Sequence, residues 1–224
     1  MQAAAYEATG VDATYSRYRV GEGDVREAVR GARALSIDGL NVTVPHKEKV
    51  AALDEVALDA TADRIGAVNT LDIDGDGIRG YNTDAAGALR AIERETEVAG
   101  KHAVVVGAGG AGRAVAFALA GEGATVAVAN RTVERAEELA ADFADLGVNE
   151  SQRLSFANQN ASRSGDVDAG GLDALGDRLP DADLLVNATS VGMDEDATPV
   201  DAALLHADIA VLDAVYTPIR TRLL

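Results

Sequence analysis

The 224-residue sequence contains no cysteine and no tryptophan, and aromatic residues make up only 4% of it. Without cysteine the chain cannot form disulfides, thiolate metal sites or a cysteine nucleophile. It has no apolar run approaching the ~20 residues needed to cross a bilayer, which argues against a membrane protein. The opening residues, MQAAAYEATG, include neither a basic region nor an apolar region. We therefore expect no secretory signal and a cytoplasmic location.

Basic residues are also scarce, and only three of them are lysines. Lys and Arg number 20 against 37 Asp and Glu, which gives a formal net charge of −17. A nucleic-acid partner would require a basic surface, so the composition argues against one. A dense carboxylate surface stays hydrated when salt screens other charges, and this predicts a halophilic protein. An acidic mesophilic protein is the alternative.

The first part of the chain mixes helical and strand-like segments. Helical spacing predicts helices over residues 1–9, 24–35, 47–60 and 83–99. A strand is expected around Tyr15 and Tyr18, and others are expected over residues 39–44, 67–73 and 77–81. The last two flank a DGDG sequence, which is typical of a hairpin turn.

After Gly100 the predicted strands become continuously apolar. They cover residues 102–106, 125–129, 182–187 and 209–215, with helices over 111–120 and 133–143. A polar stretch, 147–176, predicts a loose surface insertion with one weak strand at 153–157. Apolar strands that alternate with helices are typical of parallel sheets. We therefore expect an α/β fold in which an N-terminal α/β domain with a parallel-type sheet (1–90) precedes a C-terminal Rossmann-type domain (91–224).

The most distinctive local motif is VVVGAGGAGRAVAFAL, in which Gly107-x-Gly109-x-x-Gly112 joins a strand to a helix. In such a motif the first glycine makes the tight turn, the second admits a pyrophosphate and the third lets the helix pack on the strand. The free N–H groups at the start of the helix attract phosphate. The motif therefore predicts a dinucleotide-binding site.

The next strand ends in Asn130-Arg131-Thr132. NAD sites usually place an acidic residue here to bind the ribose 2′-hydroxyl, but this chain has Arg131. A guanidinium suits a 2′-phosphate, and Arg135 lies one helical turn further on. This pattern favours NADP over NAD. A solvated surface arginine is the alternative for Arg131.

Small and polar residues gather at several element ends in the first domain. NVTVPHK, GAVNT and GYNTD each end a predicted strand or begin a helix, where ligand sites of α/β proteins lie. Lys47 and Asp84 are the candidate catalytic pair, because a lysine beside an aspartate can exchange a proton during hydride transfer. Each also has an ordinary interpretation. Lys47 can be a surface lysine, and Asn82 or Asp84 a helix N-cap.

Taken together and in this order, NVTVPHK, GAVNT, GYNTD, GAGGAGRA, VANRT, NAT..GM and D.VY.P closely resemble shikimate dehydrogenase. The resemblance implies reversible, NADP-dependent reduction of 3-dehydroshikimate to shikimate in aromatic amino-acid synthesis. It also implies two α/β domains with the active site in the cleft between them. Glutamyl-tRNA reductases carry a pair similar to GAGGAGRA and VANRT, but their chemistry needs a cysteine that this chain lacks.

The resemblance also implies roles for individual residues. Lys47 is implied as the acid/base at the C3 oxygen, and Asp84 as a substrate ligand that holds Lys47. Thr43, Asn69 and Tyr216 are implied as further substrate contacts. The implied NADP ligands are Gly107, Ala108, Gly109, Gly110 and Ala111 at the pyrophosphate, and Asn130, Arg131, Thr132 and Arg135 at the 2′-phosphate. No metal is implied, because protein groups and the cofactor transfer the proton and the hydride.

The chain departs from the family pattern at both ends. The Ser-x-Ser-Pro loop that opens the family and the glycine-rich segment and Gln near its end are absent. We therefore expect a fragment that lacks the first strand of the substrate domain and the end of the NADP domain. Two alternatives remain open: a quinate/shikimate dehydrogenase that uses NAD, and a non-catalytic dinucleotide-binding remnant. A homodimer is a partner that the sequence leaves open.

Overall fold

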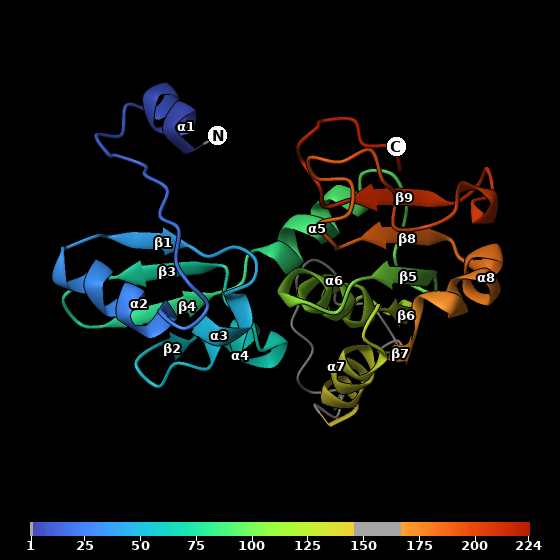
Figure 1. Cartoon of the computed structure of the whole chain (residues 1–224), viewed down its shortest axis with the longest axis horizontal. Helices are drawn as coiled ribbons and strands as arrows, with labels where there is room; N and C mark the ends of the chain where they lie inside the picture. Colours follow the sequence, from blue (N-terminus) through green and yellow to red (C-terminus); the bar gives the residue numbers. More distant parts are fainter. Residues whose placement is uncertain (1, 146–166) are drawn as a thin grey trace.

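The computed structural model describes residues 2–145 and 167–224, which form two α/β lobes, each built on its own sheet (Figure 1). The predicted α/β fold is therefore confirmed. The first helix, α1 (Gln2–Thr9), stands apart from the first lobe and ends at Gly10, whose φ of +69° suits glycine. The strand expected around Tyr15 and Tyr18 does not form, because residues 11–20 pair with no sheet in the described part of the chain.

The first lobe contains a four-stranded sheet of order β1-β3-β4-β2. β1 (Gly39–Asn41) and β4 (Ile78–Tyr81) both run antiparallel to β3 (Thr70–Ile73), and β2 (Ala57–Leu58) runs parallel to β4. The predicted parallel-type sheet is therefore wrong here except for the β2–β4 pair. The DGDG turn explains the β3–β4 pair, because strands joined by a tight turn must run antiparallel.

The helices of the first lobe only partly follow the predictions. α2 (Val25–Ala34) confirms the helix expected at 24–35. The helix expected over 47–60 is wrong beyond Ala51, because α3 (Lys47–Ala51) ends there and β2 and α4 (Ala60–Ile65) follow. Leu53 and Val56 continue the helical spacing, but they reach the core from a turn instead. α4 starts where the Asp59 carboxylate accepts a hydrogen bond from the Ala62 N–H.

In its described residues the second lobe has five parallel strands, in the order β7-β6-β5-β8-β9. They are β5 (His102–Val106), β6 (Thr125–Ala129), β7 (Val167–Gly170), β8 (Leu184–Asn187) and β9 (Ala210–Asp213). From β5, the chain adds β6 and β7 on one side of the sheet and then β8 and β9 on the other side. The strand order therefore reverses between β5 and β8. This confirms the Rossmann-type prediction and places the ligand crevice at the carboxyl ends of those two strands.

Two hydrophobic clusters lie on the two faces of this sheet. α6 (Gly110–Gly121) and α7 (Val133–Asp145) follow the first two strands and pack in one cluster, and Leu175 of α8 (Leu175–Arg178) packs in the other. The described part of the lobe also contains three short 3-10 helices: η1 (Leu172–Ala174), η2 (Leu179–Asp181) and η3 (Ala202–Leu204).

The loose insertion expected over 147–176 is wrong for its last ten residues, which form β7, η1 and the start of α8. β7 was not predicted from the sequence because this strand is half-exposed and only four residues long, so it has no continuous apolar run. The weak strand expected at 153–157 lies outside the described residues.

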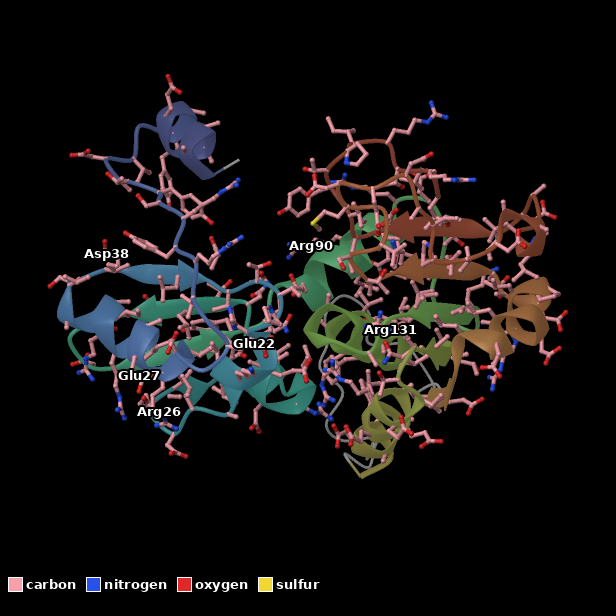
Figure 2. The ribbon with its side chains drawn as sticks, viewed as in Figure 1. Glu22, Arg26, Glu27, Asp38, Arg90 and Arg131 are labelled. Atoms are coloured by element: carbon pink, nitrogen blue, oxygen red, sulfur yellow. The ribbon has the colours of Figure 1, made fainter. Side chains whose placement is uncertain are left out.

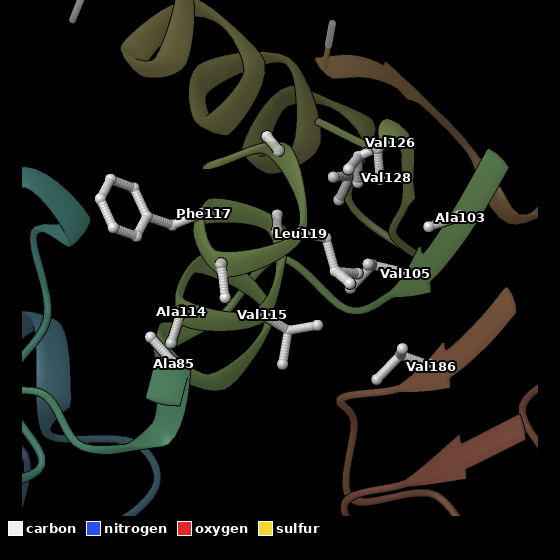
Figure 3. Packing of buried hydrophobic residues seen from close by; sticks show 14 of the residues in the cluster. Ala85, Ala103, Val105, Ala114, Val115, Phe117, Leu119, Val126, Val128 and Val186 are labelled. Carbon is white, nitrogen blue, oxygen red and sulfur yellow. The ribbon is translucent and has the colours of Figure 1, made fainter. Parts of the chain in front are cut away.

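One helix connects the two lobes. α5 (Asp84–Ile92) is shorter than the helix expected over 83–99, and it follows the first sheet directly. Its buried side chains pack in the same core as Val115 and Leu119 of α6 and Val105 of β5 (Figure 3). Ile65, at the end of α4, belongs to this core as well. The first lobe therefore supplies part of the hydrophobic core of the second.

Candidate active site

The centre of the candidate site is an ion pair between the first residues of two helices. Lys47 begins α3 and Asp84 begins α5, and the Lys47 Nζ lies 2.6 Å from the Asp84 Oδ2. The two side chains are only 13% and 29% exposed. The Val68 N–H donates to the Lys47 carbonyl, which fixes the start of α3 against the segment that leads into β3. The structure thus brings together the two residues that the sequence singled out as the catalytic pair.

Asn69 completes this cluster. Its Nδ2 donates to the Asp84 Oδ1 (2.7 Å) and to the Thr83 hydroxyl (2.9 Å). Its Oδ1 accepts from the Thr83 N–H and from the Thr70 hydroxyl, which fixes the orientation of the amide. Asp84 therefore accepts hydrogen bonds from both Lys47 and Asn69. This arrangement holds the ammonium group at one position.

Asn82 has a structural role next to this cluster. It is buried, and its Oδ1 accepts from the Asp84 N–H (3.0 Å) at the start of α5. Its Nδ2 donates to the Ala67 carbonyl (2.9 Å). Asn82 thus performs the helix-start role that the sequence allowed for either residue, and the Asp84 side chain is left for Lys47.

A backbone hydrogen bond of the neighbouring Val42 places Thr43 beside the cluster. The Val42 N–H donates to the Asn69 carbonyl (2.8 Å), which places residue 43 immediately past the end of β1 and next to Asn69. The Thr43 side chain is exposed and forms no hydrogen bond with the residues that the structure describes. Its hydroxyl is accessible to a ligand.

The glycine-rich turn, residues 107–112, has the geometry that its sequence predicts. Gly107 has a φ of +112°, and a Cβ on Gly112 would lie 1.9 Å from the Gly107 carbonyl oxygen. By contrast, the nearest contact of a Cβ on Gly109 with another part of the described chain would be the Glu48 Oε1, at 4.0 Å. The backbone is therefore tight where α6 packs on β5 and open where a phosphate would approach, so the turn fits a dinucleotide pyrophosphate.

The glycine-rich turn also touches the catalytic candidates. A Cβ on Gly110 would lie 2.8 Å from the Cβ and 3.1 Å from the Cδ of Lys47. Gly110 is therefore required for the close approach of the two lobes at this point. The predicted cofactor turn and the predicted acid/base belong to one site.

Asn130 links the glycine-rich turn to the loop after β6. Its Oδ1 accepts from the Ala108 N–H (3.2 Å), and its Nδ2 donates to the Thr132 carbonyl (2.8 Å). Arg131 and Thr132 are exposed. Figure 2 labels Arg131 in the second lobe, beside the ribbon of β6 from whose end it comes. Its guanidinium has no hydrogen-bonding or ionic partner within the described ranges and is accessible to an anion.

Arg135 has a partner that the sequence did not suggest. Its Nη2 lies 2.8 Å and 2.9 Å from the two carboxylate oxygens of Glu48, in the other lobe. Tyr216 follows β9, is 67% exposed and forms no hydrogen bond with any described residue. The structure therefore brings Lys47, Asp84 and Asn69 into direct contact and leaves Tyr216 without a polar link to them.

A buried polar network that sequence reasoning missed supports the crevice from the β8 side. Asn187 is fully buried, and its Nδ2 donates to the Asp213 Oδ1 (2.9 Å). The Thr221 hydroxyl donates to the Asp213 Oδ2 (2.6 Å). Thr189, whose N–H donates to the Asn187 Oδ1, lies against Gly107. The signal available in the sequence was an asparagine that ends a fully apolar strand.

The neighbouring lysine shows what an ordinary surface pair looks like in this lobe. Lys49 is 43% exposed, and its Nζ lies 2.7 Å from the Glu22 Oε2. The hydrogen bond from Lys49 and the charge of Lys49 hold the pKa of Glu22 below its usual value. Lys47 differs from Lys49 in being far more buried and in contacting the glycine-rich turn.

Within residues 2–145 and 167–224, no group of three His, Cys, Asp or Glu side chains is placed to hold a metal ion. In the same ranges, no helix has the length and apolar character required to cross a membrane.

The fold and the site define an oxidoreductase-type protein in which a Rossmann-type dinucleotide lobe meets a second lobe that carries a Lys–Asp pair. Comparison with known proteins gives the family. Residues 1–71 match the family model "Shikimate dehydrogenase substrate binding domain", and residues 90–167 match "Shikimate / quinate 5-dehydrogenase". The chain belongs to the shikimate dehydrogenase family.

Curated relatives agree with this assignment. The shikimate dehydrogenase (NADP(+)) of Haloarcula marismortui is 50% identical over 224 residues, which cover 100% of this chain and 76% of the relative. The protein of the same name from Halorubrum lacusprofundi is 53% identical over 232 residues, with the same two coverages.

Solved structures agree as well. A shikimate dehydrogenase in complex with NADP+ has a TM-score of 0.80 at 37% identity, over 98% of this chain and 72% of that chain. The Thermus thermophilus enzyme in complex with NADP(H) and shikimate has a TM-score of 0.77 at 35% identity, over 99% and 74%. A 5-ketofructose reductase from Gluconobacter has a TM-score of 0.72 at 32% identity, over 98% and 74%.

Proposed function

We propose that this protein catalyses the reversible, NADPH-dependent reduction of 3-dehydroshikimate to shikimate. In this proposal residues 1–90 bind the substrate and residues 91–224 bind NADP. The observation that carries it is the contact of the Lys47–Asp84 pair with the glycine-rich turn, because hydride transfer needs the proton donor and the nicotinamide at one carbonyl group. Relatives named shikimate dehydrogenase (NADP(+)) are about 50% identical to the whole chain, which supports the same reaction.

NADP fits the residues that the second lobe presents. The open backbone of Gly107, Ala108, Gly109, Gly110 and Ala111 is assigned to the pyrophosphate. Asn130, Arg131, Thr132 and Arg135 are assigned to the adenosine ribose and its 2′-phosphate. A guanidinium binds phosphate through charge-assisted hydrogen bonds, and the exposed Arg131 is accessible for this purpose. When bound, NADPH supplies the hydride that reduces the C3 carbonyl carbon.

Lys47 handles the proton in this proposal. Its Nζ donates a proton to the C3 oxygen during reduction and takes a proton from the C3 hydroxyl during oxidation. Asp84 accepts a hydrogen bond from Nζ and so aims the ammonium group, and its second oxygen is held by Asn69. Thr43, Asn69, Asp84 and Tyr216 are assigned to the hydroxyl groups and the ring of the substrate.

The proposal is tested by following NADPH oxidation with 3-dehydroshikimate in a buffer rich in KCl. The expected result is substrate-dependent oxidation that is faster with NADPH than with NADH at equal concentration. Oxidation of quinate with NAD+, together with no oxidation of NADPH by 3-dehydroshikimate, would favour the alternative quinate/shikimate dehydrogenase that uses NAD. Nucleotide binding without turnover, in protein shown to be folded by circular dichroism, would favour a non-catalytic remnant.

Three further properties belong to this proposal. Activity that increases with salt is expected from the net charge of −17 and is consistent with haloarchaeal relatives. A cytoplasmic location and a homodimer remain predictions. Gel filtration at high salt, with light scattering, measures the oligomeric state directly.

A further inference from the structure

We propose that Glu48 reduces the selectivity of this protein for NADP over NAD by competing with the 2′-phosphate of NADP for Arg135. The inference rests on the proposed function, because it assumes that NADP binds at the glycine-rich turn and at the loop after β6. It adds a residue from the first lobe that is assigned neither to the substrate nor to the cofactor.

The geometry places Glu48 between the two parts of the cofactor site. Its carboxylate oxygens lie 2.8 Å and 2.9 Å from the Arg135 Nη2. The Glu48 Oε1 also lies 4.0 Å from the position of a Cβ built on Gly109, where a pyrophosphate would approach. The negative charge of Glu48 therefore lies close to both the glycine-rich turn and Arg135.

The pair joins the two lobes. Glu48 is the second residue of α3, directly after Lys47, and Arg135 is in the first turn of α7. The side chains are 40% and 48% exposed, so solvent and salt reach the pair from one side. An exposed pair of this kind is weak enough for a ligand anion to displace.

The Arg135 guanidinium cannot bind the Glu48 carboxylate and a 2′-phosphate at the same time without bringing the two negative charges close together. A 2′-phosphate that binds Arg135 has to displace the Glu48 carboxylate or lie next to it, and both cost binding free energy. NAD has a hydroxyl at this position and does not require Arg135. Glu48 therefore weakens the binding of NADP more than it weakens the binding of NAD, and so narrows the preference for NADP.

The expected size follows from the exposure of the pair. Exposed ion pairs contribute up to ~1 kcal/mol, so replacing Glu48 by the uncharged Gln strengthens NADP+ binding by about two- to fivefold. The change for NAD+ is expected to be smaller. The probe 2′,5′-ADP, which carries the 2′-phosphate without the nicotinamide, gains as much as NADP+. Added KCl screens the charges and reduces these gains.

The experiment is isothermal titration of NADP+, 2′,5′-ADP and NAD+ into the full chain and its variants, at low and high KCl. The variants are Glu48→Gln, Arg135→Gln and the double variant. In the Arg135→Gln background the proposal expects the effect of Glu48→Gln on NADP+ to disappear. Glu134→Gln is the matched control, because Glu134 is an exposed acid one residue before Arg135 and forms no ion pair with the residues described. Circular dichroism and thermal melting check that each variant is folded.

Several outcomes would overturn the inference. Weaker NADP+ binding by Glu48→Gln would mean that Glu48 orients Arg135 for the phosphate. An equal gain in the Arg135→Gln background, or with Glu134→Gln, would mean that Glu48 acts only through general charge. NADP+ binding that is unchanged by Glu48→Gln would overturn this inference alone. Failure of the unmodified protein to bind NADP+ would overturn the proposed function and the inference with it.

Discussion

Replacing Lys47 by Met should strongly reduce kcat and leave the fold unchanged. Methionine keeps an unbranched stem of similar length, so the packing of residue 47 against Gly110 is retained. It removes the ammonium group that lies 2.6 Å from the Asp84 Oδ2 and with it the proposed proton donor. The substitution therefore separates the chemistry of Lys47 from its packing.

The structure predicts very different sizes for the two effects. Asp84 keeps its hydrogen bond from Asn69 and remains partly solvated, so the loss of one ion pair should cost about 1 kcal/mol of stability. Loss of a general acid typically reduces kcat by ~10²–10⁴-fold, which corresponds to ~2.7–5.4 kcal/mol in the activation free energy. The rate effect should therefore exceed the stability effect severalfold.

The measurement is kcat from NADPH oxidation with 3-dehydroshikimate, paired with the thermal midpoint of each protein. Lys49→Met is the matched control, because Lys49 is the same residue type in the same helix and pairs with Glu22 at the surface. It should leave kcat within about twofold, as expected for a surface substitution. A Lys47→Met protein that is folded and keeps more than about a tenth of the kcat would refute the assignment of Lys47 as proton donor.

Two further predictions follow from the second lobe. Gly112→Ala should destabilise the protein by ~1–3 kcal/mol and weaken NADP+ binding, because its Cβ would lie 1.9 Å from the Gly107 oxygen. Gly87→Ala, in a helix with open space around residue 87, should leave both unharmed, and calorimetry compares the two variants. Asp183 accepts hydrogen bonds from the His102 N–H and from Lys101, and these lower its pKa. Its stabilising contribution is therefore present above its unfolded pKa of about 4 and is lost as the pH falls through the lower folded value. Asp183→Asn should accordingly lower the thermal midpoint modestly near neutral pH, and the difference should vanish in acid. A difference in thermal midpoint that stays constant from neutral to acid pH would contradict this account.

The second lobe was more predictable than the first because of how its strands are buried. β5 and β8 are buried on both faces, so their sequences are continuously apolar and unambiguous. In the first lobe, Leu53 and Val56 have a spacing that fits a helix equally well. Only the tertiary structure shows that they pack from a turn that leads into β2, and local spacing cannot contain that information.

The site was predictable as a set of candidates but not as an arrangement. Lys47 and Asp84 stood out because each lies at an element end, yet their contact depends on how α3 and α5 meet. The choice between Asn82 and Asp84 as the helix-start residue required the hydrogen bonds themselves. The pairing of Glu48 with Arg135 joins residues that are 87 positions apart in different lobes, and no local pattern indicates it.

The shared core has a consequence for how this protein can be dissected or recombined. The predicted boundary between residues 90 and 91 falls inside α5, whose Leu89 and Ile92 lie in the hydrophobic core of the second lobe together with Ile65 of α4. Cutting the chain at that boundary would expose apolar surface on both pieces. A chimera that exchanges lobes between relatives should therefore keep residues 84–92, the whole of α5, with the dinucleotide lobe against which they pack. Asp84 would then come from the parent of the dinucleotide lobe and Lys47 from the parent of the first lobe, so their ion pair would join side chains from two parents.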